Sequence, residues 1–277
     1  VFYSAIPLVK KDFPNADLND DKFMTEKILE TAGVVQDFIN NSYNLFAKKF
    51  LNCDEHRFDI KQECIAKSAF WVTKKRYGQW IINDGGVTCA KLDVKGLDIV
   101  RSNFPTAMRH LMSLTLKGIL SNEDKDIIDD RIIDFKKSMK NNKIEDIALP
   151  TGVKGLKKYI VSGKSGILSN LKLGTPAHVK ASVRYNDLLK YLKEDNIEPI
   201  RDRSKIKWVY LKDNPLGLES IAFKGYDDPR KILDIIEKYI DCDKLYKGAL
   251  EKKIKMFYEA LGWDLPIDKK NTIHRFL

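Results

Sequence analysis

Residues 70–82 read FWVTKKRYGQWII, and residues 83–86, which follow, read NDGG. The aromatic and β-branched residues around the three cations favour β-strand, and Asp-Gly and Gly-Gly are turn signals of a hairpin. The stretch therefore predicts a β-hairpin that carries Lys74, Lys75 and Arg76 as a rigid row of positive charge, suited to a polyanionic partner. A solvated edge strand that uses lysines to prevent aggregation explains the same cations. Both interpretations stay open at this point.

Strand geometry would divide this basic stretch between two faces. Successive side chains of a strand point to opposite faces, so we expect Lys74 and Arg76 on one face and Lys75 and Tyr77 on the other. Only one of these faces can meet a nucleic-acid duplex directly. The neighbouring aromatic side chains are expected mainly to pack in the core.

The distribution of charge is more informative than its total. The 277 residues carry a net charge of +10. Residues 136–193 hold thirteen basic and three acidic residues, so this window carries the whole excess, and residues 147–186 contain no acidic residue. A solvated surface normally mixes both signs, whereas a sustained one-signed tract is typical of a surface that binds nucleic acid.

Composition excludes several classes of protein. A hydrophobic content of 43% allows a globular core, and no run reaches the roughly 18 apolar residues of a membrane span. A basic leader with a cleavage site is absent from the start of the sequence. The four cysteines include no Cys-x-x-Cys pair, which argues against a disulfide framework and a structural zinc site. We therefore expect a cytoplasmic protein.

The sequence does not contain a complete catalytic motif. The carboxylate pairs at residues 20–21, 129–130 and 227–228 fit helix caps or helix interiors, whereas two-metal chemistry needs carboxylates that converge on the ions. Gly163-Lys164-Ser165 matches only the end of a P-loop, because no glycine stands five residues before Gly163. The pattern favours binding over catalysis by this chain alone.

Hydrophobic spacing and turn residues predict the order of elements. In the first part we expect a short strand over residues 1–9 that ends at Pro7, a helix over about residues 20–50 capped by Asp20 or Asp21 and weakened at Gly33, and strands over residues 58–94. The later part is predicted to hold helices starting at Pro105 and Asn122, loops over residues 147–177, a helix over residues 177–191, strands at 207–211 and 220–223, and two final helices capped by Asp228 and Asp243, the last ending at Gly262.

Two further basic clusters accompany the first. Lys95, Gly96 and Arg101 lie together with Lys91, and Gly96 permits close approach of the backbone. Residues 176–180, PAHVK, place His178 and Lys180 at a helix start that begins with proline, where free N–H groups also favour phosphate. For His178 alone, an ordinary core or surface histidine remains the simpler interpretation.

Taken in order, several segments resemble the carboxy-terminal portion of B-family replicative DNA polymerases, particularly those of large tailed phages. KKRY at 74–77 is similar to the palm element that follows the minor groove of new duplex, and DVKGLDIVRS at 93–102 is similar to the segment that enters the thumb. PAHVK with RYN at 184–186 resembles a thumb element, and KDNPLG at 212–217 with SIAF at 220–223 resembles a segment of the phage enzymes.

This resemblance implies an α+β fold in which a β-hairpin-containing end of the palm, residues 1–100, precedes a mostly helical thumb, residues 101–264, and a flexible tail, residues 265–277. It implies a DNA-directed DNA polymerase function in which the chain binds primer–template duplex through phosphate and minor-groove contacts. The residues implied to contact DNA are Lys74, Lys75, Arg76, Tyr77, Lys95, Gly96, Arg101, His178, Lys180, Arg184, Tyr185 and Asn186.

In the family, the metal-binding Asp-Thr-Asp-Ser turn directly precedes a strand similar to Val1-Phe2-Tyr3-Ser4. The resemblance therefore implies that this chain holds no catalytic residue, metal or other cofactor of its own. A separate amino-terminal chain with the exonuclease, the fingers and the rest of the palm would supply the aspartates and the Mg²⁺. If the protein is phage-encoded, the host cytoplasm is the expected location.

The carboxy-terminal residues suggest a further partner. Ile273, Phe276 and Leu277 form an apolar motif that is similar to the terminal peptide with which phage relatives dock on the sliding clamp, and such a short anchor presents a few apolar side chains to a groove. Folding of this tail onto the last helix is the alternative.

A stand-alone, non-enzymatic DNA-binding or processivity protein would explain the charge and the missing carboxylates equally well, and this alternative stays open. RNA binding is disfavoured, because the sequence lacks an aromatic stacking motif of the RNA-recognition kind.

Overall fold

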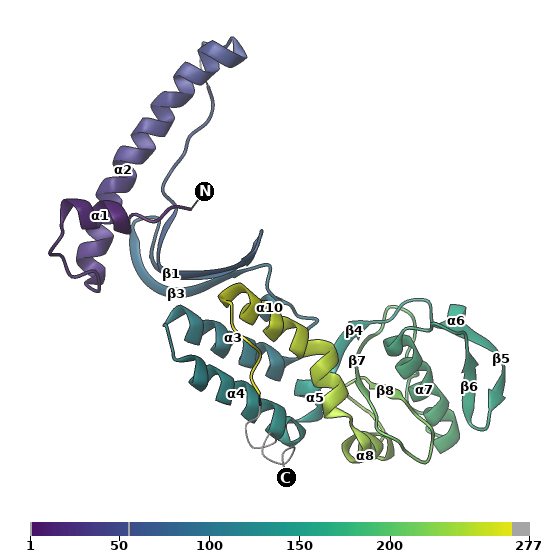
Figure 1. Ribbon diagram of the computed structural model, residues 1–277. Helices are drawn as coiled ribbons and strands as arrows, with labels where there is room; N and C mark the ends of the chain where they lie inside the picture. Colours follow the sequence, from purple (N-terminus) through teal and green to yellow (C-terminus); the bar gives the residue numbers. More distant parts are fainter. Residues whose placement is uncertain (1, 55, 268–277) are drawn as a thin grey trace. The chain divides into compact units, whose positions relative to one another are not determined.

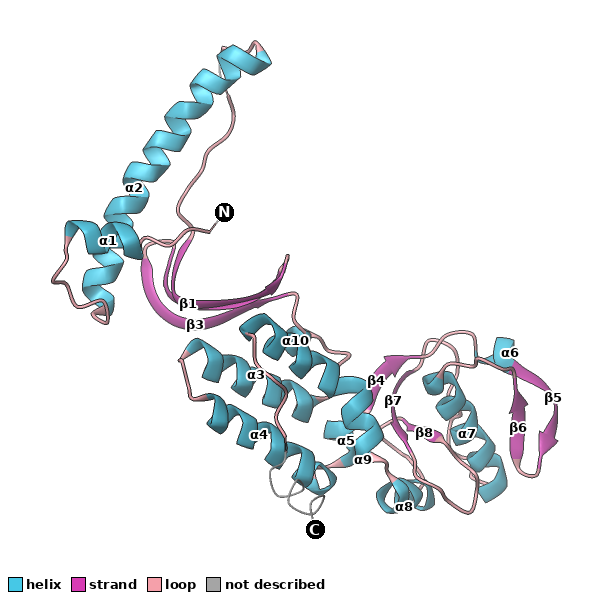
Figure 2. Cartoon of the chain, viewed as in Figure 1, coloured by secondary structure: helices cyan, strands magenta, loops and turns pink. Residues whose placement is uncertain are grey.

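The computed structural model describes residues 2–54 and 56–267, and these residues form an α+β fold of helices and small sheets (Figures 1 and 2). The chain divides into two compact units. The first contains the chain up to Trp71 together with Tyr77–Lys95. The second contains Val72–Arg76 and the chain from Gly96 onward. The described helices include none with the length and apolar character needed to span a membrane.

The first unit begins with helices. Their bounds are α1 (Ile6–Asp12), α2 (Asp21–Phe46) and a π-helical extension, η1 (Ala47–Leu51). The carboxylate of Asp20 accepts hydrogen bonds from the backbone N–H groups of Lys22 and Phe23 at 3.0 and 3.1 Å, which confirms the predicted cap. The helix continues through Gly33 without a break, so the expected weak point is not an interruption.

The strand predicted over residues 1–9 is wrong, because residues 2–5 have no regular structure and α1 begins at Ile6. Pro7 lies in the first helical turn, where its missing N–H costs nothing and its fixed φ suits the helix. The apolar run before it was too short for its spacing to separate strand from helix.

Residues 52–54 and 56–63 return along α2 without regular structure (Figure 1). The side-chain amide of Asn40 donates to the carbonyl of Ile60 at 3.0 Å and accepts from its N–H at 2.9 Å. The side-chain oxygen of Gln36 accepts from the backbone N–H of Gln62 at 3.0 Å. These polar side chains satisfy backbone groups that no sheet partner reaches.

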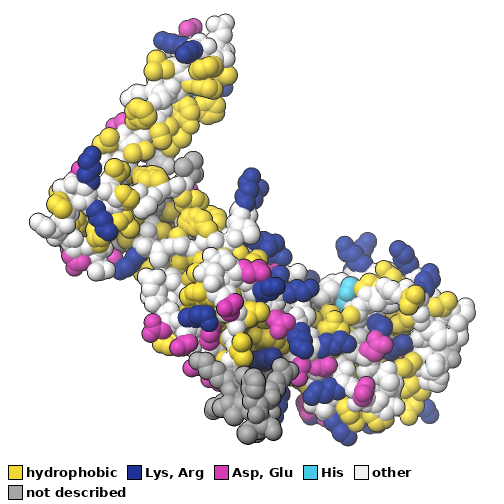
Figure 3. All heavy atoms as spheres, in the orientation of Figure 1, with side chains coloured by type: hydrophobic (Ala, Val, Ile, Leu, Met, Phe, Trp, Pro, Cys, Tyr) yellow, Lys and Arg dark blue, Asp and Glu magenta, His cyan; other side chains and the backbone are white. Residues whose placement is uncertain are grey.

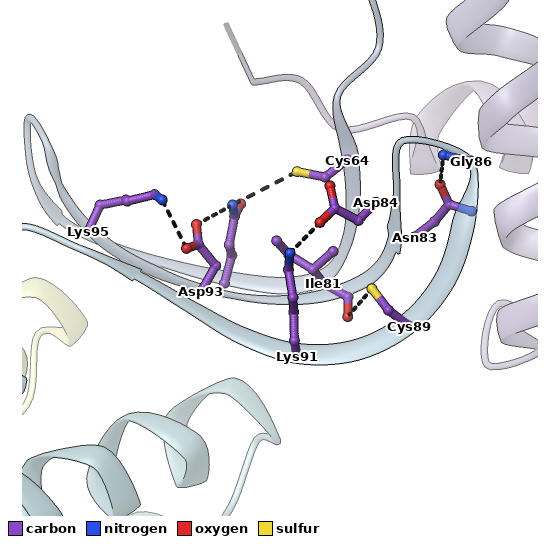
Figure 4. Close-up of polar contacts among 10 residues, drawn as sticks. Cys64, Ile81, Asn83, Asp84, Gly86, Cys89, Lys91, Asp93 and Lys95 are labelled. Carbon is purple, nitrogen blue, oxygen red and sulfur yellow. Dashed lines mark hydrogen bonds and ion pairs between the residues drawn. The ribbon is translucent and has the colours of Figure 1, made fainter. Parts of the chain in front are cut away.

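A three-stranded sheet follows in the order β1-β2-β3, with bounds β1 (Cys64–Thr73), β2 (Arg76–Asp84) and β3 (Val87–Lys95). Strands β2 and β3 are antiparallel, and their register shifts between Ile81 and Asn83. Gly85 and Gly86 form the predicted turn with φ of +58° and +90°, and the side chain of Asn83 accepts from the N–H of Gly86 at 3.0 Å (Figure 4).

The second unit opens with a series of helices. Their bounds are η2 (Asp98–Val100), α3 (Thr106–Leu120), α4 (Lys125–Ser138), η3 (Met139–Asn141) and α5 (Ile144–Ile147). Met108, Leu111 and Leu116 of the predicted stripe on α3 are 2% exposed or less. Helix α4 starts after Asp124 and not after Asn122, which has a positive φ of 54° and belongs to the preceding turn.

The second unit contains a three-stranded sheet in the order β4-β7-β8, in which β7 is antiparallel to both of its neighbours. Its strands are β4 (Leu149–Gly152), β7 (Lys205–Tyr210) and β8 (Ser220–Phe223). Helix α7 (Ala177–Leu192) packs against this sheet (Figure 1). Every residue of β8 is buried, so this strand lies in the core of the unit.

Residues 147–177, predicted as loops, contain more regular structure than expected. Besides β4 they form α6 (Leu156–Tyr159) and an antiparallel hairpin of β5 (Ile160–Ser165) and β6 (Leu168–Leu171). The frequent glycines suggested loops, but Gly155, Gly163 and Gly166 have φ of +73°, +95° and +61°, and they serve a helix start, a bulge and a hairpin turn.

The chain ends in further helices, which are α8 (Arg230–Tyr239), α9 (Cys242–Leu245), η4 (Tyr246–Glu251) and α10 (Lys252–Leu261). Two predicted caps are corrected: Asp228 accepts from the N–H groups of Lys224 and Gly225 and closes a loop, and Asp241 rather than Asp243 caps α9. Gly262 ends α10 with φ +67°, as predicted.

Candidate nucleic-acid interface

Lys74 and Lys75, the first two of the three consecutive cations, form a turn rather than a strand. We call Lys74, Lys75 and Arg76 the basic turn. Lys74 and Lys75 connect β1 to β2, and Lys75 has a left-handed φ of +64°. The predicted alternation of Lys74 and Lys75 between two faces is therefore wrong, because neither residue lies in a strand. Both side chains are exposed, while Arg76 is half-buried at the start of β2.

Tyr77 packs in an aromatic cluster of the first unit. Its ring lies 5.5 Å from that of Phe2 and 5.6 Å from that of Trp71, and Phe2 and Trp71 meet edge to face at 4.8 Å. Such pairs stabilise a sheet face beyond the area that they bury. This contact leaves Tyr77 half-buried, so its role as a DNA contact remains a prediction.

Gly96 supports the basic turn, because it lies directly against the backbone of Lys75. We call this close contact the Gly96 seat. Gly96 has φ +67°, and a β-carbon at this position would lie 2.1 Å from the carbonyl oxygen of Lys75 and 3.2 Å from Cγ of Arg76. Both the backbone conformation and the close contact require glycine here. The guanidinium of Arg76 reaches helix α10, where Nη1 donates to Sδ of Met256 at 3.6 Å. The turn is thus held from two sides by its own unit.

A carboxylate next to this seat joins two more cations. The carboxylate of Asp98 forms ion pairs with Nζ of Lys253 at 2.9 Å and with Nη1 of Arg101 at 3.5 Å. We call these three residues the Asp98 cluster. The carboxylate side chain is only 12% exposed, whereas the side chains of Arg101 and Lys253 are 47% and 31% exposed. The carboxylate therefore lies beneath two cations that both reach solvent.

Strand β3 contributes a cation of a different kind. Nζ of Lys95 lies 3.1 Å from the carboxylate of Asp93, and the hydrogen bond with Asp93 raises the pKa of Lys95 (Figure 4). Lys91 points toward Asp84 on the neighbouring strand and forms an ion pair with it. The cations of β3 thus have acidic neighbours within their own sheet, in contrast to the exposed lysines of the basic turn.

The two predicted residues at the start of α7, Lys180 and His178, differ in charge. Nζ of Lys180 lies 2.6 Å from Glu219, and this hydrogen bond lowers the pKa of the Glu219 carboxyl. His178 is half-buried, and burial lowers the pKa of its imidazole, so the side chain is neutral at pH 7. Of these residues, only Lys180 brings a positive charge to the start of the helix.

Arg184 holds the β5–β6 hairpin to α7. Its Nη1 donates to the carbonyl of Ser169 at 2.7 Å and lies 3.1 Å from the carboxylate of Asp187, whose side chain is 3% exposed. The same carboxylate accepts from the N–H and the hydroxyl of Ser169 at 2.9 and 2.5 Å. The side chain of Arg184 is 14% exposed, and the contacts of its Nη1 stabilise the fold.

The next two predicted residues are structural. Tyr185 is fully buried, with 0% exposure, and burial raises the pKa of its hydroxyl. A direct DNA contact by Tyr185 is therefore wrong for this fold. Asn186 exchanges two hydrogen bonds of 2.8 Å with the backbone of Ile200, which ties α7 to the chain that enters β7. The helical period explains both positions, because each lies on the face of α7 that turns inward.

A surface pocket of about 400 Å³ lies between the β5–β6 hairpin and the start of α7. Lys172, Thr175 and Lys180 line it together with Arg184. Figure 3 shows Lys and Arg side chains gathered over the part of the chain that carries α7 and β4–β8. The exposed lysines of the basic window include Lys154, Lys157, Lys158, Lys172 and Lys190.

The carboxylates that pair in the sequence have structural partners. Asp129 accepts from the hydroxyl of Tyr258 at 2.5 Å and from Nζ of Lys125, and Asp20 and Asp228 hold a helix start and a loop. Within residues 2–54 and 56–267, no group of three His, Cys, Asp or Glu side chains is placed to hold a metal ion.

The predicted clamp-binding residues, Ile273, Phe276 and Leu277, lie outside the described residues.

The sequence did not identify Lys253 and Met256 as residues of the candidate interface, because nothing local separates them from other residues of an amphipathic helix. A lysine one position before the buried Ile254 is an ordinary surface residue by its spacing, and only the fold brings it to Asp98.

Comparison with known protein families gives a match over most of the chain. The family model described as DNA polymerase family B matches residues 37–258, which is about four fifths of the chain. No curated protein sequence matches the chain. The matched range covers the β1–β3 sheet, the basic turn, the Asp98 cluster and the α7 cluster.

Proposed function

Because this chain belongs to DNA polymerase family B, we propose that it is the palm-to-thumb portion of a DNA-directed DNA polymerase and binds primer–template duplex. The contacts are mainly to phosphates, with minor-groove contacts at the basic turn. The observation that carries the proposal is the seat at Gly96, which holds three consecutive cations in a fixed turn beside the Asp98 cluster. Phosphate contacts of this kind set affinity and orientation without reading sequence.

The fixed geometry of the basic turn supports this proposal physically. Lys74 and Lys75 project from a turn and not from a strand face, so both can approach one groove of a duplex. Arg76 anchors the turn through Met256, and the positive φ of Lys75 fixes its direction. A turn that is ordered before binding loses less conformational entropy on binding than a flexible lysine tail would.

A second contact is proposed at the start of α7. The first N–H groups of this helix lack intrahelical partners and favour an anion. Lys172 and Lys180 line the adjacent pocket, and the one-signed window around it carries the excess charge of the chain. Duplex held at two basic surfaces is the arrangement expected of a part that grips DNA behind a polymerase active site.

The catalytic carboxylates and Mg²⁺ are proposed to come from polypeptide outside this sequence. The resemblance of the segments supports this division, and we assign no Mg²⁺ to the described carboxylates. The exposed apolar face of α2 and its extension supports a covering polypeptide, because exposed apolar patches mark interaction surfaces (Figure 3). Its members are Val34, Phe38, Leu45, Phe46, Phe50 and Leu51.

The test is the salt dependence of duplex binding by the chain. With about six to ten phosphate contacts, affinity should fall about 10³- to 10⁵-fold between 50 and 200 mM salt. Joint replacement of Lys74, Arg76 and Lys95 by Ala should weaken binding to all duplex sequences about equally. A nearly salt-independent affinity, or a loss confined to one sequence, would contradict phosphate gripping.

Purification from the native source separates this proposal from a stand-alone DNA-binding protein. An associated polypeptide that carries the palm aspartates, and nucleotide incorporation by the resulting complex, would support the polymerase function. A stable monomer that binds duplex without such a partner would support the stand-alone alternative. Adding the sliding clamp to either preparation tests the proposed role of Ile273, Phe276 and Leu277.

A further inference from the structure

The Asp98 cluster contains a cation that the motif segments do not include. Lys253 lies on α10, 155 positions after its partner Asp98, and its amine is 2.9 Å from that carboxylate. Three residues further along the same helix, Met256 contacts the guanidinium of Arg76. Residues three apart on a helix share a face, so one face of α10 touches both the basic turn and the Asp98 cluster.

Helix α10 is itself firmly anchored away from this face. The hydroxyl of Tyr258 donates to Asp129 of α4 at 2.5 Å, and Ile254 and Phe257 are buried at 1% and 0% exposure. Lys125, also on α4, lies 5.6 Å above the Tyr258 ring. These contacts fix α10 against the helices of its unit, so Lys253 is presented from a rigid element.

We propose that Lys253 is a further phosphate-contacting residue of the duplex interface, and that Asp98 positions Lys253 and Arg101 as a pair beside the basic turn. This inference rests on the proposed duplex binding and extends it to α10. The chemistry it assigns is recognition of backbone phosphates of nucleic acid. Asp98 touches no DNA in this proposal and acts only through its two cations.

The charges and the exposed fractions of the three side chains support this proposal. One carboxylate cannot neutralise two cations, so Asp98 together with Lys253 and Arg101 leaves the cluster with a net charge of about +1. Its side chain is 12% exposed, whereas both cations reach solvent. Further phosphate oxygens can therefore bind the outer faces of the cations while Asp98 holds their inner faces, an arrangement that orders long side chains before binding.

Simple electrostatics and positioning make opposite predictions for Asp98. If Asp98 is only a nearby negative charge, its replacement by Asn should strengthen binding to the phosphates. If it positions the two cations, the Asp98→Asn variant should bind more weakly, because Lys253 and Arg101 then lose their fixed orientation. The sign of the change in affinity separates the two roles.

The experiment measures binding of a fluorescent primer–template duplex to the full chain by anisotropy between 50 and 200 mM KCl, where the slope of log affinity against log salt reports phosphate contacts. Lys253→Ala should reduce the magnitude of this slope by about one and weaken binding about five- to tenfold at 0.1 M salt. The matched control is Lys255→Ala, which removes an exposed lysine of the same helix that pairs only with Glu259 at 3.6 Å. It should leave the slope unchanged.

A double-mutant cycle tests the positioning role. Asp98→Asn should weaken binding in the wild-type background and much less in the Lys253→Ala background, because the two residues act together. Asp98→Glu keeps the carboxylate and should retain most of the affinity. Thermal unfolding of each variant reports folding separately, and if Asp98→Asn fails to fold, Lys253→Ala and Asp98→Glu still decide the proposal.

The outcomes separate this inference from the proposed function. If the wild-type chain shows no salt-dependent duplex binding, the proposed function itself fails. If the wild-type chain binds and Lys253→Ala behaves like Lys255→Ala, only the contact assigned to Lys253 is overturned. Tighter binding by Asp98→Asn, or equal effects in both backgrounds, would overturn the positioning role of Asp98.

Discussion

Gly96 lies directly against the backbone of Lys75, so that a β-carbon at residue 96 would come within 2.1 Å of the Lys75 carbonyl oxygen. This contact joins two segments that resembled separate motifs, the basic turn and the stretch that follows β3. It gives the glycine a physical role as the surface on which the turn rests. The predictions below start from this relationship and move outward.

Replacement of Gly96 by Ala should displace the basic turn and destabilise the chain. The positive φ of 67° costs about 1–2 kcal/mol for a residue with a β-carbon, and the clash with backbone adds about 1–3 kcal/mol. Denaturant unfolding measures the loss, and duplex affinity should fall with it. The control is Gly217→Ala, because Gly217 has φ +63° but nothing within 4 Å of a β-carbon. Equal losses of stability in the two variants would contradict the role of Gly96 in supporting the basic turn.

Removal of the carboxylate of Asp187 should be strongly destabilising, because it leaves Arg184 and the Ser169 backbone without their buried partner. Breaking a buried ion pair in this way typically costs about 3–5 kcal/mol, and urea unfolding of Asp187→Ala measures it. Asp234→Ala is the matched control, since its pair with Arg230 is 2.8 Å long but more than half exposed on both sides. That variant should lose no more than about 1 kcal/mol, and a comparable loss would contradict the structural role of Arg184.

His178 should make the stability of the chain depend on pH in the acidic range. Burial lowers the pKa of its imidazole in the folded state, so the unfolded chain takes up a proton first as the pH falls below about 6.5. The free energy of unfolding should therefore be unaffected above that pH and decrease as the pH falls below it. Thermal unfolding from pH 8 to pH 5.5 checks this against His178→Asn, in which this part of the decrease should vanish. An identical pH dependence of the two proteins would contradict the prediction.

The apolar face of α2 should affect self-association but not folding. Phe38 and Leu45 are each 73% exposed, so replacing both by Ser should change the free energy of unfolding by less than about 1 kcal/mol and reduce aggregation of the isolated chain. Sedimentation velocity measures the association. Met24→Ser on the same helix is the control, because Met24 is 6% exposed and its loss should destabilise. A large loss of stability in the Phe38 and Leu45 variant would show that the described chain already covers this face.

Periodic patterns predicted the elements that carry a long, regular signal. The stripes of α2, α3 and α7 and the short runs of β7 and β8 were identified from spacing, because a helix or strand buries one face at a fixed period. The spacing failed where the signal was short or local: residues 6–12 became a helix, and glycines of residues 155–166 served a helix start and a hairpin. Caps at Asp124 and Asp241 replaced the predicted ones, because several polar residues near each helix start compete for that role.

The sequence named most residues of the candidate interface, and the structure changed the roles expected for several of them. The run of three cations, the glycine and the basic residues of α7 follow from the sequence, as does the family to which they belong, whereas the turn at Lys74 and Lys75 does not. Burial reassigned Tyr185 to the core, and buried hydrogen bonds made Arg184 and Asn186 mainly structural. Such reassignment needs the fold, because a motif residue looks the same in sequence whether its side chain points inward or outward.

The amino-acid sequence by itself determined the long helical segments, where the positive charge accumulates and which motifs succeed one another, since these are properties of residues near each other along the chain. Only the tertiary structure decided that Lys75 rests on Gly96 and that Asp98 joins Arg101 to Lys253. The physical reason is that Lys75 and Gly96, and likewise Asp98 and Lys253, are far apart in the sequence and come into contact only when the chain folds. No local pattern records a contact that spans 155 positions of chain.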